Sequence, residues 1–442
     1  MLIEFSVSNF RSFKDLVTLS LEADPRLSER DKGVDERNVA DTSHGKILRV
    51  AGVYGANASG KSNLIRALWT FRSLVLESAS RGQAGDPVPG DPFRLDPESE
   101  AEPSEVEVVY SEGKRQVRYG AAFSCERISR EWLFVREPES DEEVRWFERR
   151  FDPESGADVY ERGGGWTSAP ALEVATRKEA LHISTASQLN HGQAQSVLGW
   201  FQRLRVINGL AHGGSLTTTL AALASPALER PVRDLVCSLD VGVDDLRLVE
   251  VEESTREEGA RLVAALKSAL GEEIPNVSLR LPSKRITTIR SGVTFELADE
   301  SEGTARAIAL AGPLVEALAE GQIVVIDEFD ARLHTSLGKK LVELFQDPEV
   351  NRHNAQLIFA SHDTNLLTRT LLRRDQLWFV EKSHRTSSSD LYSLAEIRFE
   401  DGKRVRNDAS YEADYLQGRY GAIPFFGNLN ALLGRALSGE EG

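Results

Sequence analysis

The sequence predicts an α/β fold: a parallel sheet at the centre, an antiparallel sub-sheet, and a helical segment in the middle of the chain. Near-continuous apolar runs at 47–54, 323–326 and 356–361 have the composition of strands that are buried on both faces. Each of these runs is followed by a helical pattern, and strands that alternate with helices are typical of an α/β core.

The chain has 442 residues, which is long for one hydrophobic core. We therefore expect more than one unit. The first half of the α/β core is expected at 1–165, a helical insertion at 166–275, and the second half of the core at 276–442.

The charge balance argues against strong, non-specific binding to nucleic acid. The chain has 53 Lys and Arg against 69 Asp and Glu, a formal net charge of −16, so it repels DNA and anionic membranes at long range. Cys125 and Cys237 are too few for a disulfide framework, which fits a reducing compartment. The chain starts without a basic leader and has no apolar stretch of about 18 residues, so we expect a cytoplasmic protein without a membrane segment.

The N-terminal region begins with two short strands. Residues 2–7 and 16–21 alternate like the strands of a hairpin, with NFRSF between them. The strand at 47–54 leads through a glycine loop into a helix at 60–77, whose apolar residues recur at helical spacing. The Gly-, Pro- and acid-rich stretch at 80–104 is expected to be a loop.

The antiparallel sub-sheet is predicted next. Strands are expected at 106–110, 118–124 and 132–135, joined by hairpin turns such as SEGKR. The acidic piece at 137–143 and the glycines at 163–165 mark exposed turns around a further hairpin.

From 170 to 272 the pattern turns helical, in segments that include QAQSVLGWFQRLRVING and REEGARLVAALKSAL. Strands are expected again at 277–281 and 285–297. The next helix contains Gly312 and Pro313, where we expect a kink because proline lacks the N–H of the helical ladder.

The loop GANASGKS matches G-x-x-x-x-G-K-[ST] and lies between a strand and a helix, as a phosphate-binding loop must. Its glycines let backbone amides curl round phosphates, and the following helix adds its positive N-terminal dipole. Lys61 would reach the β- and γ-phosphates, and the Ser62 hydroxyl would ligate Mg²⁺. The alternative is an accidental glycine turn. The residues expected to bind nucleotide here are Gly55, Ala56, Asn57, Ala58, Ser59, Gly60, Lys61, Ser62 and Asn63.

The segment IVVIDE at 323–328 places two acids at the end of a buried strand. Asp327 would bind the Mg²⁺, and Glu328 would orient or deprotonate the attacking water. The alternative is that these acids cap the following turn or helix.

The set GANASGKS, ESEGTAR, IVVIDE, FDARLH and IFASHD, in this order, resembles the ABC-type ATPase head of chromosome-maintenance and recombination ATPases. The resemblance implies that nucleotide is held between two heads. Ser301 and Gly303 would be signature residues, acting across the dimer from a helix N-terminus near Thr304. ESEGT stands where that class has an L-S-G-G-Q-like form.

The same resemblance implies further roles. Asp330 would belong to the D-loop with His334 at its end, and His362 would be the switch histidine that senses the γ-phosphate. NFRSF resembles a segment that runs beside the nucleotide, so Arg11 and Ser12 are weaker candidates. No glutamine is assigned to the Q-loop, since Gln116 reads as a surface residue of a hairpin. The lone histidines show no metal-ligand spacing and are interpreted as structural or solvent-facing; they are His44, His182, His191 and His212.

The tail YLQGRYGAIPFFGNL, residues 415–429, resembles the C-terminal signature of prokaryotic AAA-type ATPases with an ABC head, the RloA-like and abortive-infection group. Membership implies an ATPase that uses ATP and Mg²⁺, forms homo-oligomers of heads and serves anti-phage defence as sensor or scaffold. It also implies a separately encoded effector, such as a TOPRIM-type nuclease.

Two other functions stay open. A DNA-maintenance ATPase would need a basic patch, and the best candidate is RLPSKRITTIR with Arg280, Lys284, Arg285 and Arg290, helped by GKRVR at 402–406. The plain alternative is a solvated edge strand. The chain could also be a nuclease itself, but 365–442 is too short for a TOPRIM domain.

Overall fold

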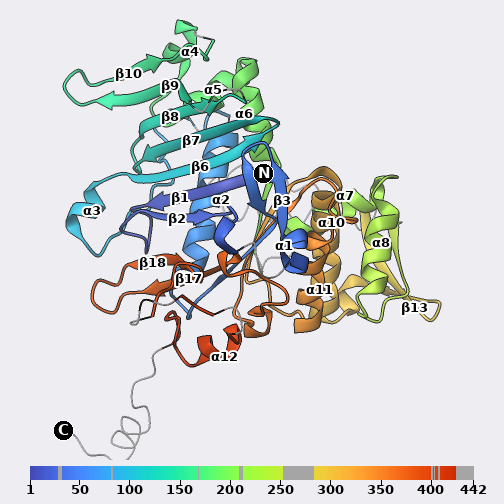
Figure 1. The fold of residues 1–442 in the computed structure, drawn as a ribbon. Coiled ribbons are helices and arrows are strands. Elements are labelled where there is room, and N and C mark those ends of the chain that lie inside the picture. Colours follow the sequence, from blue (N-terminus) through green and yellow to red (C-terminus); the bar gives the residue numbers. More distant parts are fainter. Residues whose placement is uncertain are drawn as a thin grey trace, which may run out of the picture.

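The computed structural model places two sheets and a helical lobe around a long central helix (Figure 1). It describes residues 1–27, 32–80, 83–138, 140, 142–167, 169–208, 213–251, 283–399, 402, 404–406 and 409–424. The predicted strand 277–281, the segment REEGARLVAALKSAL, Arg280, His212 and the tail beyond residue 424 lie outside the described residues.

The first sheet is antiparallel and has seven strands in the order β10-β9-β8-β7-β6-β1-β2. Its strands are β1 (Leu2–Ser8), β2 (Val17–Ser20), β6 (Ser104–Glu112), β7 (Arg115–Phe123), β8 (Ile128–Arg136), β9 (Glu143–Asp152) and β10 (Ala157–Arg162). The predicted N-terminal hairpin and antiparallel sub-sheet are confirmed, and β1 joins them into one sheet by pairing with both β2 and β6.

The stretch 80–104 is not entirely loop. It contains the short helix α3 (Pro97–Ala101), because Asp96 accepts a hydrogen bond from the Ser99 N–H and Pro97 occupies the first helical position.

The second sheet has six strands in the order β11-β15-β16-β5-β17-β18. Its strands are β5 (Val50–Tyr54), β11 (Leu204–Asn208), β15 (Ile323–Asp327), β16 (Gln356–Ala360), β17 (Leu377–Lys382) and β18 (Ser389–Ser393). All neighbours are parallel except β17 and β18. The predicted parallel core is therefore confirmed. The run 47–54 is split, since β4 (Gly45–Leu48) turns away to pair with β3 (Val39–Thr42).

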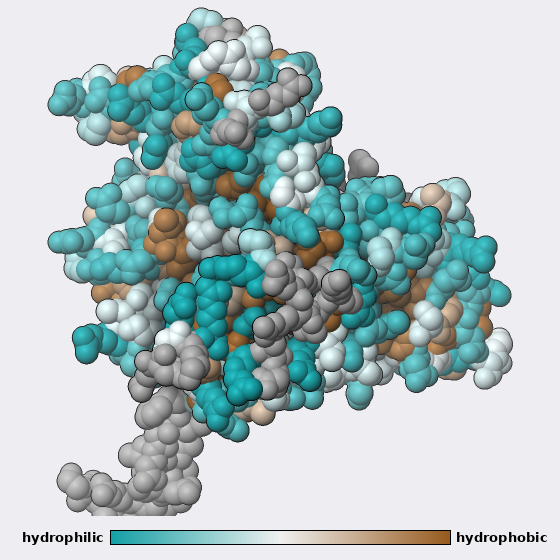
Figure 2. Space-filling model, in the orientation of Figure 1, coloured by the Kyte–Doolittle hydropathy of each residue, from teal (hydrophilic) through white to brown (hydrophobic). Residues whose placement is uncertain are grey.

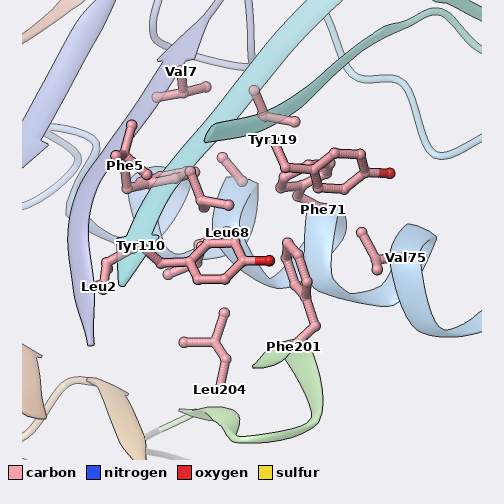
Figure 3. Close-up of a cluster of buried hydrophobic side chains, with 14 of the residues drawn as sticks. Leu2, Phe5, Val7, Leu68, Phe71, Val75, Tyr110, Tyr119, Phe201 and Leu204 are labelled. Atoms are coloured by element: carbon pink, nitrogen blue, oxygen red, sulfur yellow. The ribbon is translucent and has the colours of Figure 1, made fainter. Parts of the chain in front are cut away.

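Helix α2 (Lys61–Glu77) follows β5 and lies between the two sheets (Figure 1). Figure 3 shows its Leu68, Phe71 and Val75 facing side chains of the antiparallel sheet. The ring of Phe71 stacks on Tyr119 at 5.4 Å and meets Phe201 edge to face at 5.3 Å. This apolar contact helps to hold α2 against the antiparallel sheet.

Successive residues of the parallel strands alternate between two buried clusters. Ala51, Val325 and Ile358 join α2 in the core between the sheets. Their neighbours Val324 and Leu357 face the opposite core, which α10 (Glu302–Glu320) and α11 (Thr335–Gln346) cover. Burial on both faces explains why these strands read as continuous apolar runs.

The middle segment is not wholly helical. Helix α6 (Gly192–Gln202) ends before Arg203, and RLRVING, predicted to continue a helix, contains β11, which pairs with β15. β12 (Asp245–Glu250) also lies in the predicted helical stretch and pairs with β13 (Lys284–Arg290). The division of the chain at residues 165 and 275 stays a prediction.

The helical lobe packs α7 (Gly213–Ala224) and α8 (Glu229–Ser238) against α10. α10 is one helix from Glu302 to Glu320, with Pro313 inside it. Proline removes the N–H that would bond to Ala309 O, and the Thr219 hydroxyl of α7, 2.9 Å away, donates to that carbonyl instead. The N–H of Gly312 donates to the same hydroxyl at 3.0 Å.

The expected strand 285–297 is a hairpin, because Ser291 and Gly292 both adopt positive φ and turn the chain between β13 and β14 (Val293–Glu296). The remaining helices are α1 (Lys32–Asn38), α4 (Pro170–Ala175), α5 (His182–Gln188) and α12 (Tyr411–Leu416), with single turns η1 (Pro25–Leu27), η2 (Leu297–Asp299), η3 (Thr364–Leu366) and η4 (Arg374–Gln376).

On the face drawn in Figure 2, hydrophilic residues predominate and hydrophobic residues form separate patches, some of them over the lobe with α8 and β13. In the part of the chain that the structure describes, no helix is both long enough and apolar enough to cross a bilayer.

Candidate functional site

The site forms where four parallel strands end at the same edge of the sheet. The loop after β5, the acids after β15, His362 after β16 and the end of β17 enclose a cavity of about 510 Å³. This edge is where ligands bind in open α/β sheets. The lining residues are Ser12, Asn57, Ala58, Ser59, Gly60, Lys61, Ser62, Asn63, Asp327, Glu328, Ala360, His362 and Lys382.

The loop requires glycine at its two ends. Gly55 has φ 152° and Gly60 φ 122°, conformations that favour glycine. A Cβ on Gly55 would lie 2.3 Å from Val380 O, and one on Gly60 would lie 2.5 Å from the Ser389 hydroxyl. The loop therefore passes close to the β17–β18 hairpin, and the Ser389 hydroxyl donates to Ser59 O.

Lys61 opens helix α2 and folds back over the loop. Its ammonium donates to the carbonyls of Gly55 at 2.7 Å and Ala56 at 3.0 Å. Burial lowers the pKa of Lys61 to about 8, and the carboxylates of Asp327, Asp330 and Glu328 oppose that shift. A phosphate in the cavity would offer this buried cation an anionic partner.

Asp327 and Glu328 lie directly across the cavity from the loop. Glu328 has φ 48°, a left-handed conformation that is strained for a residue with a side chain. The turn is held because the Glu328 N–H donates to the Asp327 carboxylate at 3.1 Å and the Phe329 N–H donates to Ala360 O at 2.9 Å. These bonds fix the backbone of the turn that carries both acids.

Asp330 connects these acids to His362. Its carboxylate accepts from the His362 N–H at 3.0 Å and from the Ser361 hydroxyl at 2.8 Å. Partial burial and the positive charge of Lys61 lower the pKa of His362, which favours its neutral imidazole. The switch candidate lines the cavity from an exposed position.

Ser12 reaches the cavity and Arg11 does not line it. The Ser12 hydroxyl accepts from the Asn63 amide at 2.8 Å, so the NFRSF turn is tied to the first turn of α2. Arg11 pairs instead with Asp91 at 2.7 Å. Of the loop residues proposed for nucleotide, Gly55 and Ala56 contribute carbonyls to Lys61 and are not among the lining residues.

Ser301 and Gly303 lie outside this cavity, in a separate hollow of about 580 Å³ at the start of α10. Ser301 is exposed and caps the helix, since its hydroxyl accepts from the Thr304 N–H at 3.2 Å. His334 lines the same hollow and caps α11 by accepting from the Ser336 N–H at 3.2 Å. The site residues predicted from the sequence thus fall into two groups on one subunit.

Sequence reasoning missed two of the lining residues, Ala360 and Lys382, and of these Lys382 carries a charge. It ends the apolar run LWFVEK, and nothing near it in the sequence marks it as functional. The described tail packs beside it: Glu381 accepts from the Ala422 N–H at 3.1 Å, and the Tyr392 hydroxyl donates to Tyr420 O at 2.8 Å.

The donor chemistry fits Mg²⁺ with a nucleotide. Ser62 and Asp327 both line the cavity and offer hard oxygen ligands. Among the described residues no group of three or more His, Cys, Asp or Glu is arranged to hold a metal by itself. Mg²⁺ suits such a site, because it commonly takes one or two protein oxygens and completes its shell with phosphate and water.

The chain is a P-loop protein of the ABC type. Three features define this class: the strand order of the parallel sheet, the glycine loop that leads into α2, and the two acids at the end of β15. The family model for the "AAA domain, putative AbiEii toxin, Type IV TA system" matches residues 50–168 and 225–368, which is more than half of the chain. The chain belongs to this family of AAA ATPases. No curated protein matches it.

Several solved structures are similar. An SMC head domain from Thermotoga maritima is 15% identical, with 89% of this chain and 98% of that chain covered and a TM-score of 0.40. An SmcHead bound to the C-winged helix domain of ScpA is 13% identical, with 90% and 98% covered and a TM-score of 0.42. RecF bound to ATP is 14% identical, with 88% and 97% covered and a TM-score of 0.28.

Proposed function

We propose that the protein binds and hydrolyses ATP and works as a nucleotide-driven switch. The observation that carries this proposal is one cavity lined by Lys61, Ser62, Asp327, Glu328 and His362. Lys61 and the loop amides would hold the phosphates, and Asp327 with Ser62 would hold Mg²⁺. Glu328 would accept the proton of the attacking water, giving ADP and phosphate.

We further propose that two copies share each nucleotide. Ser301 is exposed at the N-terminus of a 19-residue helix, outside the cavity of its own subunit. A helix N-terminus attracts phosphate, so Ser301 and Gly303 of one copy would meet the γ-phosphate held by another. ATP would then favour a closed dimer, and hydrolysis would release it.

The family description supports a role in anti-phage defence, since it names a putative toxin of an abortive-infection type. In that role the ATPase would be a sensor or scaffold in the cytoplasm, and a separate effector protein, such as a TOPRIM-type nuclease, would be held or released with the nucleotide state. The alternative is a DNA-maintenance ATPase.

The basic strand β13 gives the alternative little support. Arg285 pairs with Glu296 at 3.2 Å, and Arg290 pairs with Glu300. Two of the expected phosphate contacts are therefore already neutralised within the chain. DNA binding through this strand would require these pairs to break, and the net charge of −16 would oppose it.

The test is the Glu328→Gln variant. The amide keeps the size of the side chain but cannot take the proton, so we expect turnover to fall about 100-fold or more while ATP affinity stays within about threefold. Phosphate release measures turnover, and titration calorimetry measures affinity.

Glu343→Gln, at a half-buried surface position of α11 where Glu343 pairs with Lys340, is the matched control and should keep full turnover. Normal hydrolysis by Glu328→Gln would remove Glu328 from the mechanism. Adding duplex DNA to the wild type separates the two roles: an unchanged rate favours the defence role, whereas strong stimulation favours DNA maintenance.

A further inference from the structure

Arg306 is a buried charge that has no hydrogen-bond partner among the described residues. Its side chain is 0% exposed, in the second turn of α10. Its Nε, Nη1 and Nη2 atoms are all enclosed, and within the described part of the chain none has a hydrogen-bond acceptor. An unsatisfied, desolvated guanidinium destabilises a fold, so its presence calls for a functional reason.

Other buried arginines of this chain are satisfied. Arg149, 1% exposed, bonds to Asp158 at 2.7 Å and to Ala180 O at 2.7 Å. Arg373, 7% exposed, pairs with Asp375 at 2.7 Å. Arg149 and Arg373 thus have hydrogen-bond and ion-pair partners inside the fold. Arg306 has no such hydrogen bond among the described residues.

Arg306 lies on the helix whose N-terminus carries Ser301 and Gly303. It is five positions after Ser301, and its neighbour Ala307 packs in the same buried cluster as Phe329, the neighbour of Glu328. The carboxylate of Glu328 interacts electrostatically with the Arg306 guanidinium. Burial and the positive charge of Arg332 lower the pKa of Arg306 to about 10, and the Glu328 carboxylate opposes that shift. The side chain therefore keeps its charge at neutral pH.

The first turn of α10 also touches the turn that carries Glu328. A Cβ on Gly303 would lie 2.9 Å from Arg332 O, so glycine permits this close approach. The Arg332 guanidinium pairs with Glu302 at 3.2 Å. These contacts connect the start of α10 to the turn that carries Glu328, so a shift of α10 would act on that turn.

We propose that Arg306 is a positioning residue for Glu328. The proposal rests on the ATPase function above. When Ser301 and Gly303 engage a nucleotide held by a second copy, α10 shifts and the guanidinium donates hydrogen bonds to the Glu328 carboxylate. Glu328 would then supply the hydrogen-bond partner that Arg306 lacks in the present conformation. This added interaction would favour the closed dimer. Each subunit thereby aligns its own glutamate fully when its signature end is occupied and about tenfold less effectively when it is not.

The experiment compares Arg306→Met and Arg306→Lys with the wild type in thermal unfolding and in steady-state ATP hydrolysis. Methionine fills similar space without a charge, so Arg306→Met should raise Tm by about 2 °C or more. It should lower kcat about tenfold or more and leave KM within about twofold, and Arg306→Lys should recover part of kcat. A lower Tm with lost activity and no recovery by lysine would mean a structural role and overturn the proposal.

Two further results separate this proposal from the proposed function. If the wild type does not hydrolyse ATP, the ATPase function itself fails. If the wild type is active and Arg306→Met keeps its kcat, only the positioning role fails. In the Glu328→Gln background, Arg306→Met should reduce the residual rate no further, because both changes act on one group. A second tenfold loss there would contradict an action through Glu328.

Discussion

At the scale of single residues, the site depends on backbone conformations that are rare for side chains. Ala58 has φ 60° and Glu328 φ 48°, and both line the cavity. Such conformations persist only where surrounding contacts enforce them, and they gather at functional sites. Here the loop is held by the β17–β18 hairpin and the acidic turn by Ala360 O.

Lys61→Ala tests the phosphate cradle. The change removes the cation that spans the loop, so ATP affinity should fall about 100-fold or more in calorimetry. Lys340→Ala, on the exposed side of α11, is the control and should bind normally. Retained affinity in Lys61→Ala would place the nucleotide elsewhere.

Residues that local patterns mark were predictable from the sequence. The loop at 55–62 and the acids 327–328 each follow a buried strand, and the structure brings them to one cavity. Lys382 and Arg306 were not predictable, because their significance depends on what the fold places beside them. Lysine at the end of a strand and arginine within a helix are common in proteins, so neither residue stands out in the sequence as functional.

At the scale of elements, long periodic or uniformly apolar segments were predicted well. α2, β15 and β16 agree with their sequence patterns because local propensity and burial favour the same structure. β11 was missed because its five residues follow α6 after a single residue, Arg203. β11 is a strand because it pairs in parallel with β15. β15 lies far along the chain, so the local sequence around β11 does not indicate this pairing.

Gly312→Ala tests how closely α7 and α10 pack. The new Cβ would lie 2.3 Å from Thr219 Cα. This is a backbone atom, so the clash can be relieved only by moving the helix. We expect the free energy of unfolding to fall by about 1–3 kcal/mol in urea denaturation. Gly199→Ala, with nothing within 4 Å of its Cβ, should instead be neutral or stabilising by up to about 1 kcal/mol. Equal effects of the two changes would contradict the packing.

At the scale of the whole molecule, the arrangement separates the two halves of the proposed catalytic pocket. The cavity with Lys61 and the hollow with Ser301 have no lining residue in common. A single copy thus carries both halves in different places, which suits a head-to-tail pair that encloses two nucleotides. Helix α10 joins the two places within each copy.

Mixing two inactive variants tests this claim most directly. Lys61→Ala lacks a working cradle and Ser301→Arg blocks the signature end, so each alone should hydrolyse almost no ATP. Mixed in equal amounts, they can form pairs with one intact composite site, which allows at most about a quarter of the wild-type turnover. The Glu328 of that site lies in the copy whose own signature end is blocked, so the roughly tenfold effect assigned to Arg306 lowers the expected turnover to about a fortieth of the wild-type value, still well above either variant alone. A mixture that stays as inactive as its parts, or full turnover by Ser301→Arg alone, would contradict a nucleotide shared between two copies.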